Sequence, residues 1–154
     1  VAAMQQNKFS VAKKFIEQGK LWPENLGVGK PYDDNIDTRL EDWMLYLTEK
    51  NKTGNNAKAL LDKIISFKPA TENTISNFLP SNALITALAI SKANGKDQAM
   101  QWLEQQATAF PAHKEVFEWS RNVLNGGNKL SITENIKDSN QNILTAMLRS
   151  GVLL

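Results

Sequence analysis

Hydrophobic positions recur at helical spacing along most of the chain, and the most regular stretch lies between Pro80 and Pro111. There an apolar segment, a turn at Gly95 and a second, amphipathic segment follow one another. The apolar faces consist of Leu84, Ala87, Leu88 and Ser91 in the first segment and Ala99, Trp102, Leu103, Ala107 and Phe110 in the second. Because residues spaced i, i+3 and i+4 share one face of a helix, the pattern predicts two helices with buried stripes, joined as an antiparallel αα-hairpin. One hairpin cannot bury both of its faces, so we expect neighbouring helices of the same kind.

The same periodicity predicts helices along the rest of the chain, and no segment is predicted to form a strand. The further helices are expected over about residues 3–17, 35–50, 57–67, 112–125 and 138–150, with an extra turn or short helix over 71–78. The apolar tail, residues 152–154, is expected to pack against the fold. The sequence therefore predicts an all-α fold of about seven helices.

The order of these helices predicts one domain over residues 1–154, built from hairpins. Residues 35–69 and 80–111 are expected to form the two full hairpins. Residues 112–154 would form a degenerate C-terminal hairpin or cap. Residues 1–22 carry one helix without a preceding partner and are interpreted as an orphan half-repeat, which suggests a fragment of a longer chain.

Composition and charge exclude some classes of protein but do not indicate a reaction. The chain has 154 residues, 42% of them hydrophobic and 22% charged, as is ordinary for a globular domain. Its formal net charge is +2, with acidic and basic residues interspersed. That pattern argues against a dedicated nucleic-acid or membrane surface, and no apolar run approaches the roughly 20 residues of a membrane span. There is no Cys, so thiolate chemistry and disulfides are excluded.

Two segments carry residues that could bind ions, and for both we favour a structural interpretation. Gly27 to Lys30 resembles part of a phosphate-binding loop, but Pro31 stands where Ser or Thr and a helix should follow. Asp33, Asn35 and Asp37 alternate as in a calcium loop, but Thr38 and Met44 occupy the positions of the turn Gly and the bidentate Glu. We expect Asp34 to cap the next helix and Asp37 to lie in its first turn.

No catalytic constellation, cofactor site or metal site is predicted. His113 is the single His and is expected at an exposed helix start, without a recognisable catalytic partner. Trp43 and Trp102 fall on apolar stripes and are predicted to be core residues. The positions of Trp22 and Trp119 stay open, and an exposed pair would indicate carbohydrate stacking.

The hairpin spacing resembles the tetratricopeptide repeat (TPR). Trp43 lies eleven residues before Gly54, and Ala57 lies twelve before Pro69. In the central hairpin Leu84 lies eleven residues before Gly95, and Ala99 twelve before Pro111. The turns are one or two residues shorter than the family pattern, and Leu47 replaces a usual Gly. The resemblance implies a short right-handed solenoid of hairpins with a C-terminal capping helix.

The segment from Trp22 to Pro31, with the sequence WPENLGVGKP, resembles a connector in large bacterial TPR proteins. Those proteins carry an N-terminal β-rich domain of unknown function, with a suggested connection to carbohydrate. The resemblance implies a C-terminal helical region of a long bacterial protein, with periplasmic or exported localisation left open.

In the TPR family the first helix of each repeat lines a concave groove that takes peptides or partner helices. Carried over by position, the candidate groove consists of Glu41, Met44, Thr48, Asn82, Ile85, Ala89 and Lys92. The set lacks the paired basic clamp expected for a terminal carboxylate. The alternative is a groove filled by the C-terminal helix, since terminal elements of repeat arrays often act as caps.

Two functions are compatible with these observations, and a free-standing enzyme is not expected. The first is a non-catalytic module that contacts a partner protein, a peptide or an upstream domain of its own chain. A homodimer through the exposed face of the first helix is a variant of it. The alternative is an accessory helical domain of a carbohydrate-active or other enzyme, contributing to its cleft. No cofactor, nucleic acid or membrane insertion is expected in either case.

Overall fold

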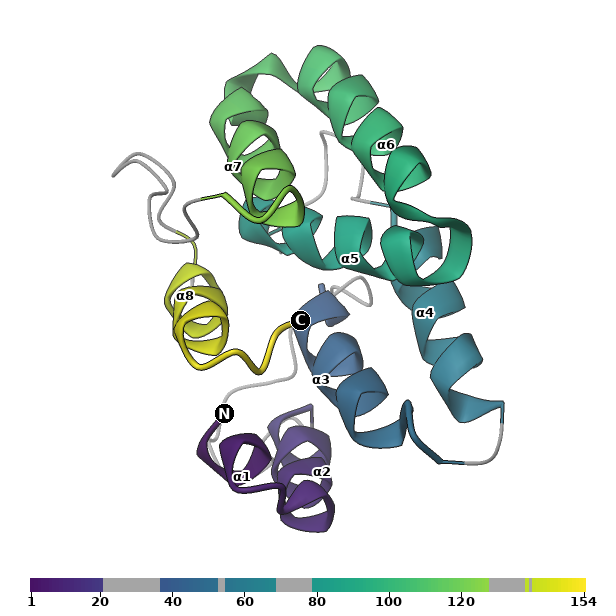
Figure 1. Ribbon diagram of the computed structural model, residues 1–154, viewed down its shortest axis with the longest axis vertical. Coiled ribbons are helices and arrows are strands. Elements are labelled where there is room, and N and C mark those ends of the chain that lie inside the picture. Colours follow the sequence, from purple (N-terminus) through teal and green to yellow (C-terminus); the bar gives the residue numbers. More distant parts are fainter. Residues whose placement is uncertain (21–36, 53–54, 69–78, 128–137, 139) are drawn as a thin grey trace, which may run out of the picture.

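The computed structural model describes residues 1–20, 37–52, 55–68, 79–127, 138 and 140–154. The described residues contain no strand and form eight α-helices and two short 3₁₀ helices (Figure 1): α1 Ala2–Gln5, α2 Phe9–Gly19, α3 Arg39–Glu49, α4 Asn56–Ser66, η2 Pro80–Asn82, α5 Ala83–Asn94, α6 Lys96–Ala109, η3 Pro111–His113, α7 Lys114–Leu124 and α8 Gln141–Arg149. The prediction of an all-α fold is confirmed. The Trp22–Pro31 connector, the phosphate-loop segment, Asp33 to Asn35, Gly54 and the expected short helix over 71–78 lie outside the described residues.

Helix α5 lies at the centre of the fold, as the periodicity of the 80–111 stretch indicated. Every residue from Ala83 to Ile90 is buried, because α3, α4, α6 and α7 all pack against this helix (Figure 1). Its apolar side chains divide between two cores. Leu84, Ile85 and Leu88 belong to the larger core with α3 and α8, and the smaller core with α6 and α7 includes Ala87. A helix that is apolar all round is accommodated only in such an interior position.

Gly95 is the single residue between α5 and α6, and its conformation explains the tight turn. Its φ of 100° and ψ of 158° lie in a region open essentially to Gly alone. Helix α6 leaves this turn and packs against both α5 and α7. Its predicted stripe is buried only in part, because Ala99 and Leu103 are fully covered, Trp102 is half-buried and Phe110 is 42% exposed.

The first helix is broken, which corrects the single helix expected over residues 3–17. Asn7 has a φ of 56°, the backbone amide of Lys8 donates to the carbonyl of Ala3 at 2.8 Å, and that of Asn7 donates to Met4 at 3.0 Å. These two bonds form a Schellman motif with Asn at the left-handed position. Helix α1 therefore ends at Gln5 and packs against α2, which begins at Phe9.

The C-terminal end returns to the middle of the fold through a second Schellman motif. Gly151 has a φ of 70°, and the amide of Val152 donates to the carbonyl of Met147 at 3.0 Å. The turn directs Leu153 into the larger core, where it is fully buried. The expected packing of the apolar tail is confirmed for Leu153, whereas Leu154 is 43% exposed.

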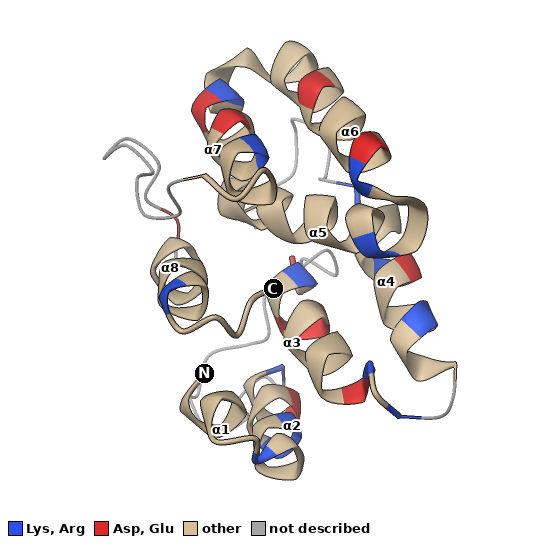
Figure 2. Ribbon diagram, viewed as in Figure 1, with Lys and Arg blue, Asp and Glu red and all other residues tan. Residues whose placement is uncertain are grey.

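Charged residues are interspersed along the outer helices and sparse on the central one (Figure 2). Helix α5 carries only Lys92, near its C-terminal end, and α8 carries only Arg149. Among the described helices, none is long and apolar enough to cross a membrane.

Candidate functional site

Helix α3 has two flanks that differ in how completely they are covered, and the predicted groove residues divide between them. Thr48, Asn82, Ile85 and Ala89 are buried, with exposures of 4% or less. Glu41 and Met44 are half-buried, and Lys92 is exposed at the end of α5. The structure therefore does not bring the set together along one open surface.

On one flank, α8 and the C-terminal tail cover the surface that α3 and α5 share. Leu144, Met147, Leu148 and Leu153 from these elements join the core formed with α3 and α5. The indole nitrogen of Trp43 donates to the carbonyl of Leu153 at 3.1 Å. We call this arrangement the C-terminal lock. It corresponds to the alternative in which the C-terminal helix fills the groove.

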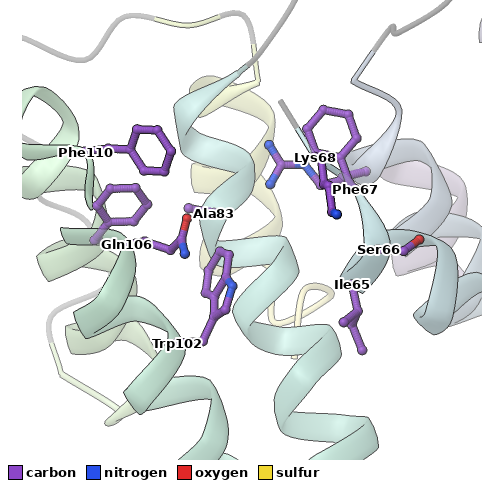
Figure 3. A pocket seen from close by; sticks show the side chains of 10 residues that line it. Ile65, Ser66, Phe67, Lys68, Ala83, Trp102, Gln106 and Phe110 are labelled. Carbon is purple, nitrogen blue, oxygen red and sulfur yellow. The ribbon is translucent and has the colours of Figure 1, made fainter. Parts of the chain in front are cut away.

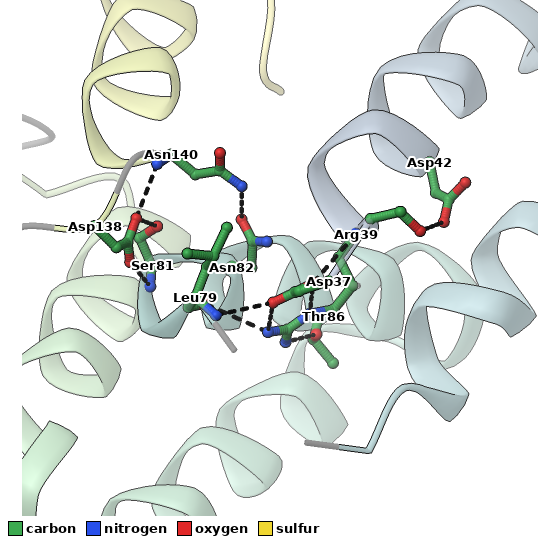
Figure 4. Close-up of polar contacts among 10 residues, drawn as sticks. Asp37, Arg39, Asp42, Leu79, Ser81, Asn82, Thr86, Asp138 and Asn140 are labelled. Atoms are coloured by element: carbon green, nitrogen blue, oxygen red, sulfur yellow. Dashed lines mark hydrogen bonds and ion pairs between the residues drawn. The ribbon is translucent and has the colours of Figure 1, made fainter. Parts of the chain in front are cut away.

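A buried polar cluster fixes the start of α8 against the start of α5 (Figure 4). Asp138 accepts hydrogen bonds from the backbone and hydroxyl of Ser81 at 2.7 and 2.6 Å. The same carboxylate accepts from the amides of Asn140 and Gln141, at 3.0 and 3.1 Å, where α8 begins. The side-chain amide of Asn140 donates to that of Asn82 at 3.1 Å. One carboxylate thus starts a helix and attaches it to its neighbour.

A second polar cluster in Figure 4 corrects the role expected for Asp37. Its buried carboxylate pairs with the guanidinium of Arg39 at 2.6 and 2.8 Å and accepts from the amide of Leu79 at 3.2 Å. Arg39 also donates to Thr86 on α5 at 2.9 Å and lies 4.3 Å from the ring centre of Phe67. Asp37 precedes α3, which begins at Arg39, and its carboxylate neutralises a buried cation that joins α3, α4 and α5.

On the other flank, α1, α2 and α3 enclose an apolar cavity of about 390 Å³, which we call the N-terminal groove. Its walls are Val1, Ala2, Ala3, Met4, Ala12, Phe15, Ile16, Gly19, Glu41 and Met44. Glu41 and Met44, two of the predicted site residues, therefore lie in one cavity. The volume falls within the range of about 300–1,000 Å³ typical of ligand pockets.

Large apolar side chains of α2 are exposed, and one of them, Phe15, lines this groove. Phe15 is 66% exposed, Val11 42% and Phe9 36%. The same α2 stripe buries only Ala12 and Ile16. A second depression, formed by Ser10, Val11, Lys14, Phe15 and Gln18, adjoins the groove and shares Phe15 with it. The apolar face of α2 is thus covered by other helices only in part.

Glu41 is the one acidic residue that lines the groove. Its Oε2 atom is buried and accepts no hydrogen bond from the described residues. Burial raises the pKa of Glu41 above its usual value of 4.5, an effect that a hydrogen bond from its own backbone amide and the charge of Lys20 oppose only in part. The ammonium of Lys20 is instead hydrogen-bonded to Asp42. An apolar cavity therefore contains a carboxylate that is poorly solvated and has no cation bonded to it among the described residues.

Ion pairs attach α2 to α3 on the side of α3 that carries Asp42 and Glu49. Burial alone would raise the pKa of Asp42, but hydrogen bonds from Lys20, Lys63 and Thr38 outweigh it and lower that pKa. Lys13 lies 3.0 Å from Glu49, and the hydrogen bond between them lowers the pKa of Glu49 and raises that of Lys13. These pairs hold the two helices together without filling the groove.

A second pocket of about 280 Å³ lies where α4, α5, α6 and α7 meet (Figure 3). Its walls are largely aromatic and also include cationic and amide groups: Arg39, Ile65, Ser66, Phe67, Lys68, Ala83, Trp102, Gln106, Phe110 and Phe117. Trp102, expected as a core residue, is half-buried and lines this pocket. The guanidinium of Arg39 is already bound by Asp37 and Thr86.

The remaining sequence candidates do not assemble into a reactive centre within the described residues. His113 ends η3 and is half-buried rather than exposed. Trp119 is 5% exposed, so it belongs to the core, and Trp22 lies outside the described residues. In the described part of the chain, no group of three His, Asp or Glu side chains could hold a metal ion.

Comparison with protein-family models, with curated proteins and with solved structures gives no match for this chain. Function must therefore be inferred from the chain's own surfaces. Sequence reasoning expected an exposed face on the first helix, as the contact of a possible homodimer, but did not single out Phe15 on α2. Phe9, Val11 and Phe15 place apolar residues around more of the helix than one neighbouring helix can cover.

Proposed function

We propose that this chain is a non-catalytic helical-repeat module, TPR-like in plan, that mediates contact with a partner protein or an adjoining domain. The observation that carries the proposal is the N-terminal groove with the exposed side chain of Phe15, which lines it, and that of Val11 in the adjoining depression. Contiguous exposed apolar surface on a globular domain marks an interaction site more often than chance exposure does.

The C-terminal lock supports this location by contrast. TPR-like modules bind in the groove formed by their first helices, but here α8 and the tail occupy the surface of α3 and α5. An occupant of that surface would have to displace a fully buried Leu153 and break the Trp43 hydrogen bond. The N-terminal groove requires no such displacement.

The test is affinity capture with Phe15→Glu as the decisive variant and Phe110→Glu as its matched control. Both substitutions replace an exposed Phe with an acid, and Phe110 lies at the far end of α6. Captured proteins are identified and the complex is rebuilt from purified components. We expect Phe15→Glu to abolish binding and Phe110→Glu to retain it, with both variants folded by circular dichroism. Equal binding by both variants would contradict the proposal.

The second candidate is an accessory helical domain that contributes to the cleft of a carbohydrate-active or other enzyme. It draws support from the pocket in Figure 3, because Trp102 and Phe110 offer partly exposed aromatic faces beside the amide of Gln106. A glycan array probed with the wild type and Trp102→Leu tests it. Binding that Trp102→Leu removes would favour this function, and an array without signal would exclude it.

A further inference from the structure

The described surface offers several features that the proposed function does not use. The most informative is the carboxylate of Glu41, whose Oε2 atom has no hydrogen-bond partner among the described residues. It lies in a cavity otherwise formed by apolar side chains and a Gly. Carboxylates are rarely placed in such surroundings without a cation or hydrogen-bond donors, because desolvation penalises the ionised form. The ammonium groups of Lys20 and Lys63 do not serve as that cation, because both are bound to Asp42.

We infer that the N-terminal groove binds a protein segment that inserts a Lys or Arg side chain onto Glu41 and an apolar side chain beside Phe15. This inference rests on the proposed function and specifies the chemistry of the partner.

The shape of the groove favours a long basic side chain. Met4, Ala12 and Ile16 form apolar walls along which the methylene stem of Lys or Arg can pack, while its charged end reaches the carboxylate. Met44, with its flexible side chain, can adjust to either stem. A cation that arrives there replaces the hydrogen bonds that Oε2 of Glu41 lacks among the described residues.

The second depression favours a peptide over a small amine. Phe15 separates the N-terminal groove from the hollow at Val11 and Lys14, and it lines both. A ligand that fills both hollows needs two side chains held on one backbone. The charge of Lys14 at the second hollow disfavours another cation there, and the apolar walls of Val11 and Phe15 favour an apolar second side chain.

Selection from a phage-displayed library of random peptides tests the inference, because it requires no identified partner. Peptides are selected on wild-type protein after depletion on Phe15→Glu. We expect the survivors to share one Lys or Arg near an apolar residue. Glu41→Gln should weaken their binding about tenfold or more, since hydrogen bonds to charged groups contribute about 1.5–3 kcal/mol. Glu104→Gln, an exposed carboxylate on α6, is the matched control and should bind as the wild type does.

A double-mutant cycle completes the test. Replacing the shared Lys or Arg of a selected peptide with Gln should remove the difference between the wild type and Glu41→Gln. Peptides without a shared basic residue, or equal binding by Glu41→Gln, would overturn the inference and leave the proposed function intact. Failure to recover any peptide that requires Phe15 would overturn both. Self-association that depends on Phe15 but not on Glu41 would identify a second copy as the occupant and overturn the inference alone.

Discussion

Within the described residues, one flank of α3 is closed by α8 and the C-terminal tail, and the other is open beside α1 and α2. On the closed flank, the C-terminal lock combines four buried side chains of α8 and the tail with hydrogen bonds to Trp43, Ser81 and Asn82. On the open flank, α1 and α2 contribute Met4, Ala12 and Ile16 to burial and leave Phe15 exposed.

The difference lies in the polar groups as much as in the apolar ones. Asp138 and Asn140 find several partners on the closed flank, although the side-chain nitrogen of Asn82 there has none among the described residues. On the open flank, the carboxylate of Glu41 leaves one oxygen unpartnered among the described residues. Satisfied buried polar groups specify one arrangement, and an unsatisfied group is a place where a ligand can gain free energy. The closed flank therefore serves mainly to stabilise the fold, and the open flank is available for binding.

The largest expected effect on stability comes from the ion pair between Asp37 and Arg39, which joins α3, α4 and α5. Arg39→Met would leave the buried carboxylate of Asp37 without its counter-charge, which typically costs 3–5 kcal/mol, so we expect a loss of about that size. Urea unfolding followed by circular dichroism measures it. Adding Asp37→Asn to Arg39→Met should recover part of the loss. A single variant as stable as the wild type would show that the pair contributes nothing to the free energy of unfolding.

The next effect concerns the attachment of α8. Asp138→Ala removes an acceptor shared by Ser81, Asn140 and Gln141, and we expect a loss of about 2 kcal/mol. Hydrogen exchange should show lower protection in α8, with α4 unchanged. Asp62→Ala, which breaks only an exposed pair with Lys58 on α4, is the control and should cost less than about 0.5 kcal/mol. Uniform loss of protection over all helices would contradict a separate role for the lock.

On the open flank, Asp42→Asn tests how α2 is held to α3. Removing the charge that Lys20, Lys63 and Thr38 bind should cost about 1–2 kcal/mol at neutral pH. Because the pKa of Asp42 is lower in the folded protein than its usual 3.8, its contribution is complete above pH 3.8 and is lost as the pH falls further. Unfolding curves between pH 3 and pH 7 should show the difference between the wild type and Asp42→Asn shrinking only below pH 3.8. A difference that disappears near pH 6 would contradict this assignment.

The smallest expected effect is a gain, rather than a loss, in the free energy of unfolding. Glu41→Met replaces a poorly solvated carboxylate with an apolar side chain of similar length, so we expect the free protein to gain about 1 kcal/mol at neutral pH. The pKa of Glu41 is raised in the folded protein, so the wild type itself gains stability as the pH falls through that pKa toward 4.5. The advantage of Glu41→Met should therefore shrink between pH 7 and pH 4.5, which unfolding at several pH values can measure. Glu104→Met, on exposed α6, should show no such dependence.

The sequence predicted the helices better than it predicted which surfaces they cover. Periodicity located α3 to α8 and identified the central role of α5, because an apolar segment bounded by Pro80 and Gly95 leaves few other arrangements. The helical periodicity continues across Asn7, so the sequence predicted one helix and missed the break there. Asn marks a left-handed turn less clearly than Gly does. An exposed face of the first helix was expected as a homodimer contact, but the sequence did not identify Phe15 as its exposed residue. A stripe shows that one face is apolar and does not show which part of it another helix covers.

The residues carried over from the TPR resemblance are divided between two surfaces. Glu41 and Met44 were placed in a groove by resemblance to TPR proteins, and they do line a cavity, although its other walls are α1 and α2. Asn82 and Ile85 were placed in the same groove, but they lie under the C-terminal lock. The partners of Arg39 and Asp138 could not be predicted, since Thr86 and Ser81 are 47 and 57 positions away along the chain.

The hydrogen bond from Trp43 to Leu153 joins residues 110 positions apart in a fold whose other packing is mostly between consecutive helices. Local hairpins can form while the chain is still being synthesised, but the indole of Trp43 meets its acceptor only after residue 153 has emerged from the ribosome. Until then, the surface of α3 and α5 that the tail later covers is exposed to other chains. This flank is therefore covered later in synthesis than the hairpins against which the tail packs.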